Sequence, residues 1–385
     1  MLVVTIFLLM ALQFLTTFEM MLVMPLAPVI AELYGILPVN ITLMNLGFAA
    51  AGFVSPFFGY LADYFSMKRI LQLATLFFGI GSLLVYTNTF VGYIVGRLII
   101  GLGYYNLTSI AMSYTSLIVD NNKLGVVAGV YKIAFALGAF SAPILGTWLQ
   151  ETISFHNIYL ILAVSGLVGT FALQVIPDKR IVQEVPLKMN DAFSLVKDRK
   201  AQLMIAANVS LNLPTIYFYN YLSVSMAESG INQGTISQFY SIVAFGSILA
   251  GVLIALFSDK FGKRRLSILS VAFSGIVLLP FITGSKYILF FGFLFGLGYD
   301  TIWGIFYPPG ATFYRAKSAT FLAILTFTTS VSNVFTNMTA PIIYDIGGFP
   351  LLMGICCIGL VVSSFLMKGA FALDNQEQEI TIRNH

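Results

Sequence analysis

Charged residues are scarce in this sequence. Asp, Glu, Lys and Arg make up only 9% of its 385 residues, whereas soluble proteins carry about a quarter. Hydrophobic residues account for 58%, and the mean hydropathy is +0.90. A chain with so little charge cannot cover a water-exposed surface, so we expect the lipid bilayer to be its main surroundings.

Cysteine and histidine are also rare. Cys356 and Cys357 are adjacent and cannot readily close a disulfide, and two thiols do not make a metal cage. The two histidines, His156 and His385, form no metal or catalytic cluster, and there is no phosphate-binding loop. We therefore expect no enzyme activity, no cofactor and no metal site. The net charge of +4 is dispersed over short loops, which indicates no nucleic-acid partner.

Long apolar runs fill the chain instead. Only helices or closed barrels satisfy the backbone in lipid, and continuous runs of this length indicate helices. The breaks predict twelve spans, at residues 4–33, 40–62, 70–88, 91–118, 125–149, 157–176, 202–226, 234–257, 266–284, 287–312, 320–343 and 348–367. We expect Pro25 and Pro28 to interrupt the first span, and Pro308 and Pro309 to interrupt the tenth.

Three motifs occur twice, about half a chain apart. Asp63–Arg69 recurs as Asp259–Arg265, Gly101–Tyr104 as Gly296–Tyr299, and Ala142–Ile144 as Ala340–Ile342. Such a repeat indicates two like halves that run the same way through the bilayer. The predicted fold is an all-α integral membrane protein, with twelve transmembrane helices in two parallel-repeat six-helix bundles around a central cavity.

The repeat and the charges divide the chain. We predict an N-terminal bundle at 1–176, a cytoplasmic linker at 177–200, a C-terminal bundle at 201–368, and a poorly ordered cytoplasmic tail at 369–385. Of the 20 Lys and Arg residues, only Arg97 and Lys132 lie in spans, and only Lys286 lies in a loop on the opposite side from the rest. The basic side predicts cytoplasmic termini in a plasma (inner) membrane protein.

The loop motif resembles a known signature. Gly59–Arg69 is similar to loop 2–3 of the major facilitator superfamily, and Ala255–Arg265 is similar to its weaker repeat, although Ser66 replaces a usual glycine. The resemblance implies a gate that locks the halves together on the cytoplasmic side when the transporter faces outward. Its residues would be Gly59, Asp63, Lys68, Arg69, Asp259, Gly262, Arg264 and Arg265. The alternative is a charge cluster that only sets topology.

Two spans extend the resemblance. Gly96-Arg97, followed by Gly101 and Gly103, resembles the family's span-four motif with its buried arginine. Gly138–Gly146 resembles the span-five motif of the family's antiporters, but Ala142 replaces the glycine before the proline. This departure weakens the antiport assignment and leaves the fold assignment unchanged.

Ionisable residues inside spans cost several kcal/mol unless they are paired or hydrated. Glu19 occupies a place where drug-efflux members of the superfamily carry an acid, and we expect it to face the seam between the halves and to carry a proton. The alternative for Glu19 is a permanently hydrogen-bonded structural acid. Arg97 could pair with it, as a proton-coupled partner or as a static ion pair. Asp300 is the third candidate for proton coupling, with a structural carboxyl as the alternative. We expect Lys132 to snorkel toward the cytoplasmic interface.

Polar faces on spans seven and eleven predict a central cavity, because a polar face in lipid must look inward. The candidate lining residues are Gln13, Thr16, Tyr105, Asn208, Asn212, Tyr219, Trp303, Tyr307, Thr329, Asn333 and Asn337. Hydroxyls, amides and aromatic rings with few charges suit a small amphiphilic organic solute. Hydrogen bonds between helices, without any contact to solute, are the alternative for each residue.

These observations predict a secondary active transporter that works by alternating access. We expect a monomer in the lipid bilayer that exports a small organic solute in exchange for protons. Uptake or facilitated exchange of a metabolite or sugar is the alternative within transporters. A transporter-like scaffold or sensor that moves nothing is the alternative from another class.

Overall fold

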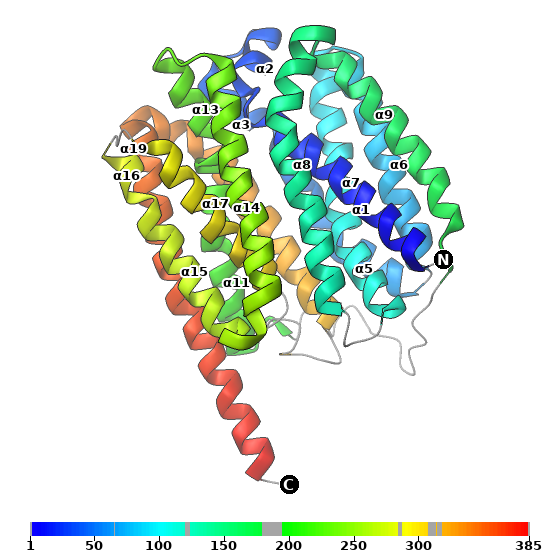
Figure 1. Cartoon of the computed structure of the whole chain (residues 1–385), viewed down its shortest axis with the longest axis vertical. Helices are drawn as coiled ribbons and strands as arrows, with labels where there is room; N and C mark the ends of the chain where they lie inside the picture. The colour runs from blue at the N-terminus through cyan, green and yellow to red at the C-terminus, as the bar shows by residue number, and fades with distance from the viewer. Residues whose placement is uncertain are drawn as a thin grey trace.

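The computed structural model describes residues 2–64, 66–119, 124–178, 195–283, 287–306, 313 and 318–383. Its regular elements are all helical within these ranges. Figure 1 shows two helix bundles side by side, the first in blue to green and the second in green to red. The described residues contain ten stretches long and apolar enough to cross a membrane. The all-α membrane architecture predicted from the sequence is thus confirmed.

The first half contains the predicted spans one to six. Its elements are α1 (Leu2–Val23), α2 (Ala27–Tyr34), η1 (Pro38–Asn40), α3 (Ile41–Met44), α4 (Leu46–Ala50), η2 (Ala51–Val54), α5 (Ser55–Tyr64), α6 (Met67–Tyr86), α7 (Phe90–Ile118), α8 (Leu124–Ile153), α9 (Phe155–Ala172) and η3 (Leu173–Val175). Span two is therefore built from short α and 3₁₀ pieces rather than one regular helix.

The second half contains the predicted spans seven to twelve. Its elements are α11 (Arg199–Leu211), α12 (Leu213–Tyr217), α13 (Tyr219–Glu228), α14 (Gln233–Phe261), α15 (Lys263–Val277), α16 (Leu279–Ile282), α17 (Ile288–Ile305) and α19 (Ser318–Arg383). The helix α19 holds two spans, since it loses helical geometry at Gly347 and Gly348. Figure 1 shows the chain reversing there.

Proline positions explain several breaks. Pro25 lies in the turn between α1 and α2, and Pro28 stands in the first turn of α2, so the predicted interruption of span one is confirmed. Pro214 and Pro280 open α12 and α16 in the same way. The predicted interruption of span ten at residues 308–309 lies outside the described residues.

The expectation of a poorly ordered tail is wrong for residues 369–383. The helix α19 continues to Arg383 and projects beyond the bundle (Figure 1). Asp374 holds its first part in place. That carboxylate is 3% exposed, accepts from the Lys200 ammonium at 3.3 Å, and also accepts from the Arg264 guanidinium. Buried ionic hydrogen bonds of this kind fix a helix that composition alone marks as a free tail.

Glycine permits a close helix contact in the second half. A Cβ atom on Gly246 would lie 2.3 Å from the carbonyl oxygen of Phe293, so α14 and α17 approach more closely there than a side chain would allow. Between α1 and α8, a Cβ on Gly138 would lie 2.8 Å from the carbonyl oxygen of Phe14. Small residues at such contacts are how membrane helices gain packing without a hydrophobic driving force.

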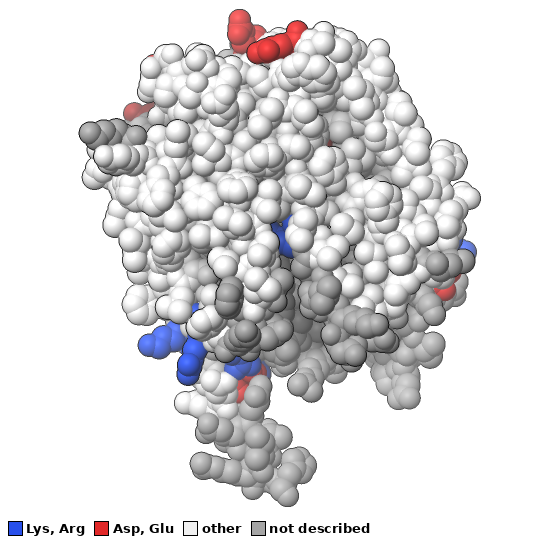
Figure 2. Space-filling view, viewed as in Figure 1, with Lys and Arg blue, Asp and Glu red and all other residues white. Residues whose placement is uncertain are grey.

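The two halves meet along α8 with α14, and along α3–α5 with α19. Three side chains of the second half donate to backbone carbonyls of the first at the end where α2 and α13 lie. Tyr221 donates to Val39 at 2.7 Å, Ser223 to Met24 at 2.9 Å, and Gln233 to Pro25 at 2.7 Å. We call these three contacts the α2–α13 seal. Figure 2 shows a hollow along the seam below this end, with a basic side chain inside it.

Candidate functional site

One buried ion pair lies inside the first half. Arg97 on α7 donates through Nη1 to Oε1 of Glu19 on α1, and the Tyr159 hydroxyl on α9 donates to the same oxygen at 2.8 Å. Arg97 Nε donates to Asn45 Oδ1 at 3.2 Å, and its guanidinium lies 4.3 Å from the centre of the Phe48 ring. Glu19 is fully buried and Arg97 is 3% exposed. Pairing and hydrogen bonds thus compensate both charges away from water.

The position of this pair differs from the sequence prediction in one respect. Every described partner of Glu19 and Arg97 belongs to the first half, so Glu19 lies within a bundle and not at the seam. Its second oxygen, Oε2, has no hydrogen-bond partner among the described residues. A proton could reside there without displacing Arg97 or Tyr159 from Oε1.

A second ion pair joins the two halves. Lys132 Nζ on α8 donates to Oδ1 of Asp300 on α17 at 3.1 Å, and the Ser247 hydroxyl on α14 donates to Oδ2. The Lys132 ammonium also lies 4.0 Å from the centre of the Phe135 ring. The side chains of Lys132 and Asp300 are 17% and 9% exposed. The prediction that Lys132 snorkels to the interface is therefore wrong, because it binds an acid of the other half.

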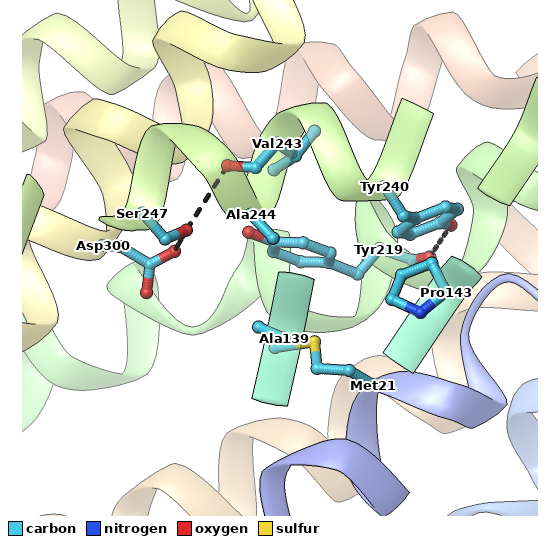
Figure 3. Close-up of a pocket in the computed structure, with 9 residues that line it drawn as sticks. All are labelled: Met21, Ala139, Pro143, Tyr219, Tyr240, Val243, Ala244, Ser247 and Asp300. Atoms are coloured by element: carbon cyan, nitrogen blue, oxygen red, sulfur yellow. Dashed lines mark hydrogen bonds between the residues drawn. The ribbon is translucent and has the colours of Figure 1, made fainter. Parts of the chain in front are cut away.

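Asp300 lines a small cavity between the halves. The cavity measures about 10 Å³, which is space for about one water molecule. Its wall comes from α1, α8, α13, α14 and α17, at Met21, Ala139, Pro143, Tyr219, Tyr240, Val243, Ala244, Ser247 and Asp300. Figure 3 shows Asp300 and Ser247 at one end of this group, and Tyr240 and Pro143 at the other.

The other polar residues predicted in the first half bind mainly within it. Gln13 Oε1 accepts from the Thr108 hydroxyl at 3.2 Å, and Thr16 donates to the carbonyl of Leu12 in its own helix at 3.0 Å. Tyr105 reaches across the seam, since its hydroxyl accepts from Asn333 Nδ2 at 3.2 Å. The structure thus separates a polar layer inside the first bundle from contacts at the seam.

Span seven and span eleven share a buried amide network within the second half. Asn208 Nδ2 donates to the hydroxyl of Thr329 at 2.9 Å and to the carbonyl of Leu325 at 2.8 Å. Asn212 Nδ2 donates to the carbonyl of Asn208 at 2.7 Å. The bonds from Asn208 to Thr329 and Leu325 are the interhelical bonds that the sequence left open as the alternative to a cavity wall, whereas the bond from Asn212 to Asn208 lies within its own span.

The remaining predicted cavity residues divide three ways. Asn337 Nδ2 donates to the carbonyl of Asn333 at 2.7 Å, and the side-chain oxygens of both residues have no described hydrogen-bond partner. Trp303 packs edge-on against Tyr299, with ring centres 6.0 Å apart. Tyr307 lies outside the described residues. The two asparagine oxygens therefore offer acceptors to a visiting group.

Two basic residues of the loop motif, Lys68 and Arg264, bind within their own half. Lys68 donates to the carbonyl of Gln174 at 2.6 Å, and Arg264 donates to Asp374 and Asn375. Arg69 and Arg265 are exposed, Gly59 lies in α5, and Gly262 joins α14 to α15 with φ of 81°. The side chains of Asp63 and Asp259 lie outside the described residues. The lock between halves implied by the resemblance therefore remains a proposal.

Sequence reasoning missed four residues of these clusters. Tyr159, Asn45 and Ser247 are single polar residues in apolar runs, and no spacing distinguishes them from residues that bond to their own helix. Asp374 was visible as an acid but was assigned to the tail. In the part of the chain that the structure describes, no group of three His, Cys, Asp or Glu side chains could hold a metal ion.

Comparison with known sequences gives the family. The model of the Major Facilitator Superfamily matches residues 9–227 and 201–382. An uncharacterised transporter of this type from Methanocaldococcus jannaschii is 26% identical over 261 residues, which cover 64% of this chain and 66% of that one. A sialic acid transporter of Escherichia coli is 24% identical over 271 residues, which cover 68% and 66%. The matches thus span just under two thirds of these two relatives.

Other comparisons agree in fold. A multi-drug resistance efflux pump homologue of Lactococcus lactis is 26% identical over 304 residues, which are 72% of each chain. The structure of the human organic anion transporter superposes with a TM-score of 0.77 at 15% identity, over 94% of this chain and 99% of that one. A D-xylose–proton symporter gives 0.76 at 15% identity, over 94% and 96%. With a family model that matches both halves and a shared two-bundle fold, the chain belongs to the major facilitator superfamily.

Proposed function

We propose that this chain is a secondary transporter that exports a small, amphiphilic organic solute in exchange for protons, by alternating access. It acts in the plasma membrane, as a monomer with both termini in the cytoplasm. The observation that carries this proposal is the ion pair between Lys132 and Asp300, which joins the two halves beside a cavity at their seam.

Rocking of the two halves would separate Lys132 from Asp300. Lys132 and Asp300 belong to different halves, so a relative motion at the seam changes the distance between them. A carboxylate that loses its partner in a low-dielectric site costs several kcal/mol unless it is protonated or hydrated. Proton binding at Asp300 is therefore linked to the conformational change, because it removes the charge that holds Lys132.

The direction of solute transport follows from competition between the solute and a proton for Asp300. A solute that needs the charged form of Asp300 and a proton that removes that charge cannot bind together, so each crosses the membrane in its own half of the cycle. Such exclusion couples inward proton movement to outward solute movement. Glu19 offers a second proton position, because its Oε2 has no described partner while Oε1 holds Arg97 and Tyr159.

The names of the relatives include both export and uptake. One is a multi-drug resistance efflux pump homologue, and another is a sialic acid transporter. Uptake of a metabolite is therefore the second candidate. It would require proton and solute to bind at the same time, which the shared carboxylate disfavours.

The test is a solute screen in proteoliposomes that carry an internal pH reporter. Wild-type protein should move protons only when a transported solute is added, and Asp300→Asn should abolish this coupled signal. Asp345→Asn, at a residue placed in none of these clusters, is the matched control. Solute flux that proceeds at the same rate with and without a pH gradient would show that the proton coupling is wrong.

A further inference from the structure

We propose that the solute carries a cationic head group, and that Lys132 is a built-in competitor for the place of that head group at Asp300. The inference rests on the proposed function and names the substrate class of the same site. It starts from the cavity wall, where Asp300 is the only charged residue among those that the structure describes. An anion in that space would face a carboxylate at close range.

The rest of the wall also suits a cation with an apolar body. The rings of Tyr219 and Tyr240 line the cavity together with Met21 and Pro143 (Figure 3). Aromatic ring faces attract cations, and attract them more strongly where water is excluded. Methionine adapts its shape to irregular apolar groups. The wall therefore combines one acid, two rings and adaptable apolar surface.

The charge balance around Asp300 leaves one exchangeable partner. In the described part of the chain, the titratable groups near it are Lys132 from α8, Tyr219 from α13, Tyr240 from α14, and Tyr299 from its own helix. Phenols are neutral at ordinary pH. The only charge that compensates Asp300 among these groups is the Lys132 ammonium, which approaches Oδ1 at 3.1 Å while Ser247 occupies Oδ2.

The Lys132 side chain can dissociate from Asp300 and bind it again. Its side chain is 17% exposed, it sits on a flexible stem, and the nearby Phe135 ring, 4.0 Å from the ammonium, gives it a second resting contact. Three cations thus share one carboxylate: the ammonium of Lys132, a proton, and the head group of the solute. When the solute has left, Lys132 takes its place and keeps the buried acid paired.

The cavity as it stands holds only about one water molecule. That small size agrees with a site filled by its own competitor. A solute must displace Lys132 and widen the seam. Its apparent affinity therefore equals the intrinsic affinity multiplied by the fraction of time that Asp300 is free of Lys132.

A binding experiment in detergent tests this without transport. The probes are tetraphenylphosphonium, a permanent cation, and tetraphenylborate, an anion of the same shape. Lys132→Met should bind the cation more tightly than wild type, by about tenfold if Lys132 holds the site for about nine tenths of the time. Asp300→Asn should lose cation binding. Lys368→Met removes an exposed ammonium and is the matched control, expected to leave affinity unchanged.

The outcomes separate the inference from the proposed function. Lowering the pH should weaken cation binding to wild type, because protons take the same carboxylate. Preferential binding of tetraphenylborate, or unchanged cation affinity in both Lys132→Met and a folded Lys132→Gln variant, would overturn the inference. Binding as expected together with flux that ignores a pH gradient would instead overturn proton coupling and leave the cation site standing.

Discussion

Replacing Arg97 with methionine should destabilise the protein far more than it does when Glu19 is replaced at the same time. In the wild type, the fully buried Glu19 carboxylate is balanced by Arg97 and by the Tyr159 hydroxyl at 2.8 Å. Arg97→Met keeps an apolar stem of similar length and removes the charge. It leaves a carboxylate in an apolar bundle with one neutral donor.

The magnitude follows from the burial of both partners. Breaking a buried pair by removing one member costs about 3–5 kcal/mol, whereas replacing both with uncharged groups is often close to neutral. Glu19→Gln combined with Arg97→Met should therefore recover most of that loss. Tyr159→Phe removes one hydrogen bond to a charged acceptor and should cost about 1.5–3 kcal/mol.

The assay is a double-mutant cycle on unfolding of the purified protein in mixed micelles. We expect a coupling energy of at least about 3 kcal/mol between positions 19 and 97, because the double variant should recover most of the loss caused by Arg97→Met alone. Lys368→Met, which removes an exposed charge, should leave the unfolding free energy unchanged. Additive losses at the two positions would refute the reasoning, because they would mean that the two charges do not compensate each other.

Three further predictions concern packing, the C-terminal helix and the α2–α13 seal. Gly246→Ala should cost about 1–3 kcal/mol of stability because its Cβ would meet the Phe293 carbonyl, whereas Gly251→Ala in the same helix has open space and should be neutral or slightly stabilising. Asp374→Asn should make α19 beyond the bundle more sensitive to limited proteolysis, and unchanged cleavage would contradict its anchoring role. Ser223→Ala removes the hydrogen bond to Met24 and should weaken the α2–α13 seal by about 1 kcal/mol. The expected result is a longer spin-label distance between α2 and α13, and an unchanged distance distribution would count against the seal.

The fold was largely predictable from the sequence because lipid imposes few solutions. The apolar runs and the repeated motifs led to the two-bundle arrangement. The break at Pro25 and Pro28 also followed from local chemistry, since proline lacks the donor that a helix needs. The short pieces of span two did not follow, because only packing against α7 and α19 decides their geometry.

The candidate site was predictable only in part. Charged residues are rare in membrane spans, so Glu19, Arg97 and Asp300 could be recognised from the sequence as candidates. Their partners were harder, because one sequence does not reveal which helix faces which. Lys132 could equally reach the interface or a neighbouring acid, and the outcome depends on the packing of α8 and α17 against the same helix, α14.

The most direct test of exchange between proton and solute is the direction of movement under opposite pH gradients. The same proteoliposomes, loaded with the same solute, are placed first in an alkaline and then in an acidic medium. Exchange predicts that the solute accumulates on the acidic side in both cases, as protons leave that side, and that Asp300→Asn abolishes the effect. Accumulation on the alkaline side, or no dependence on the gradient, would contradict it.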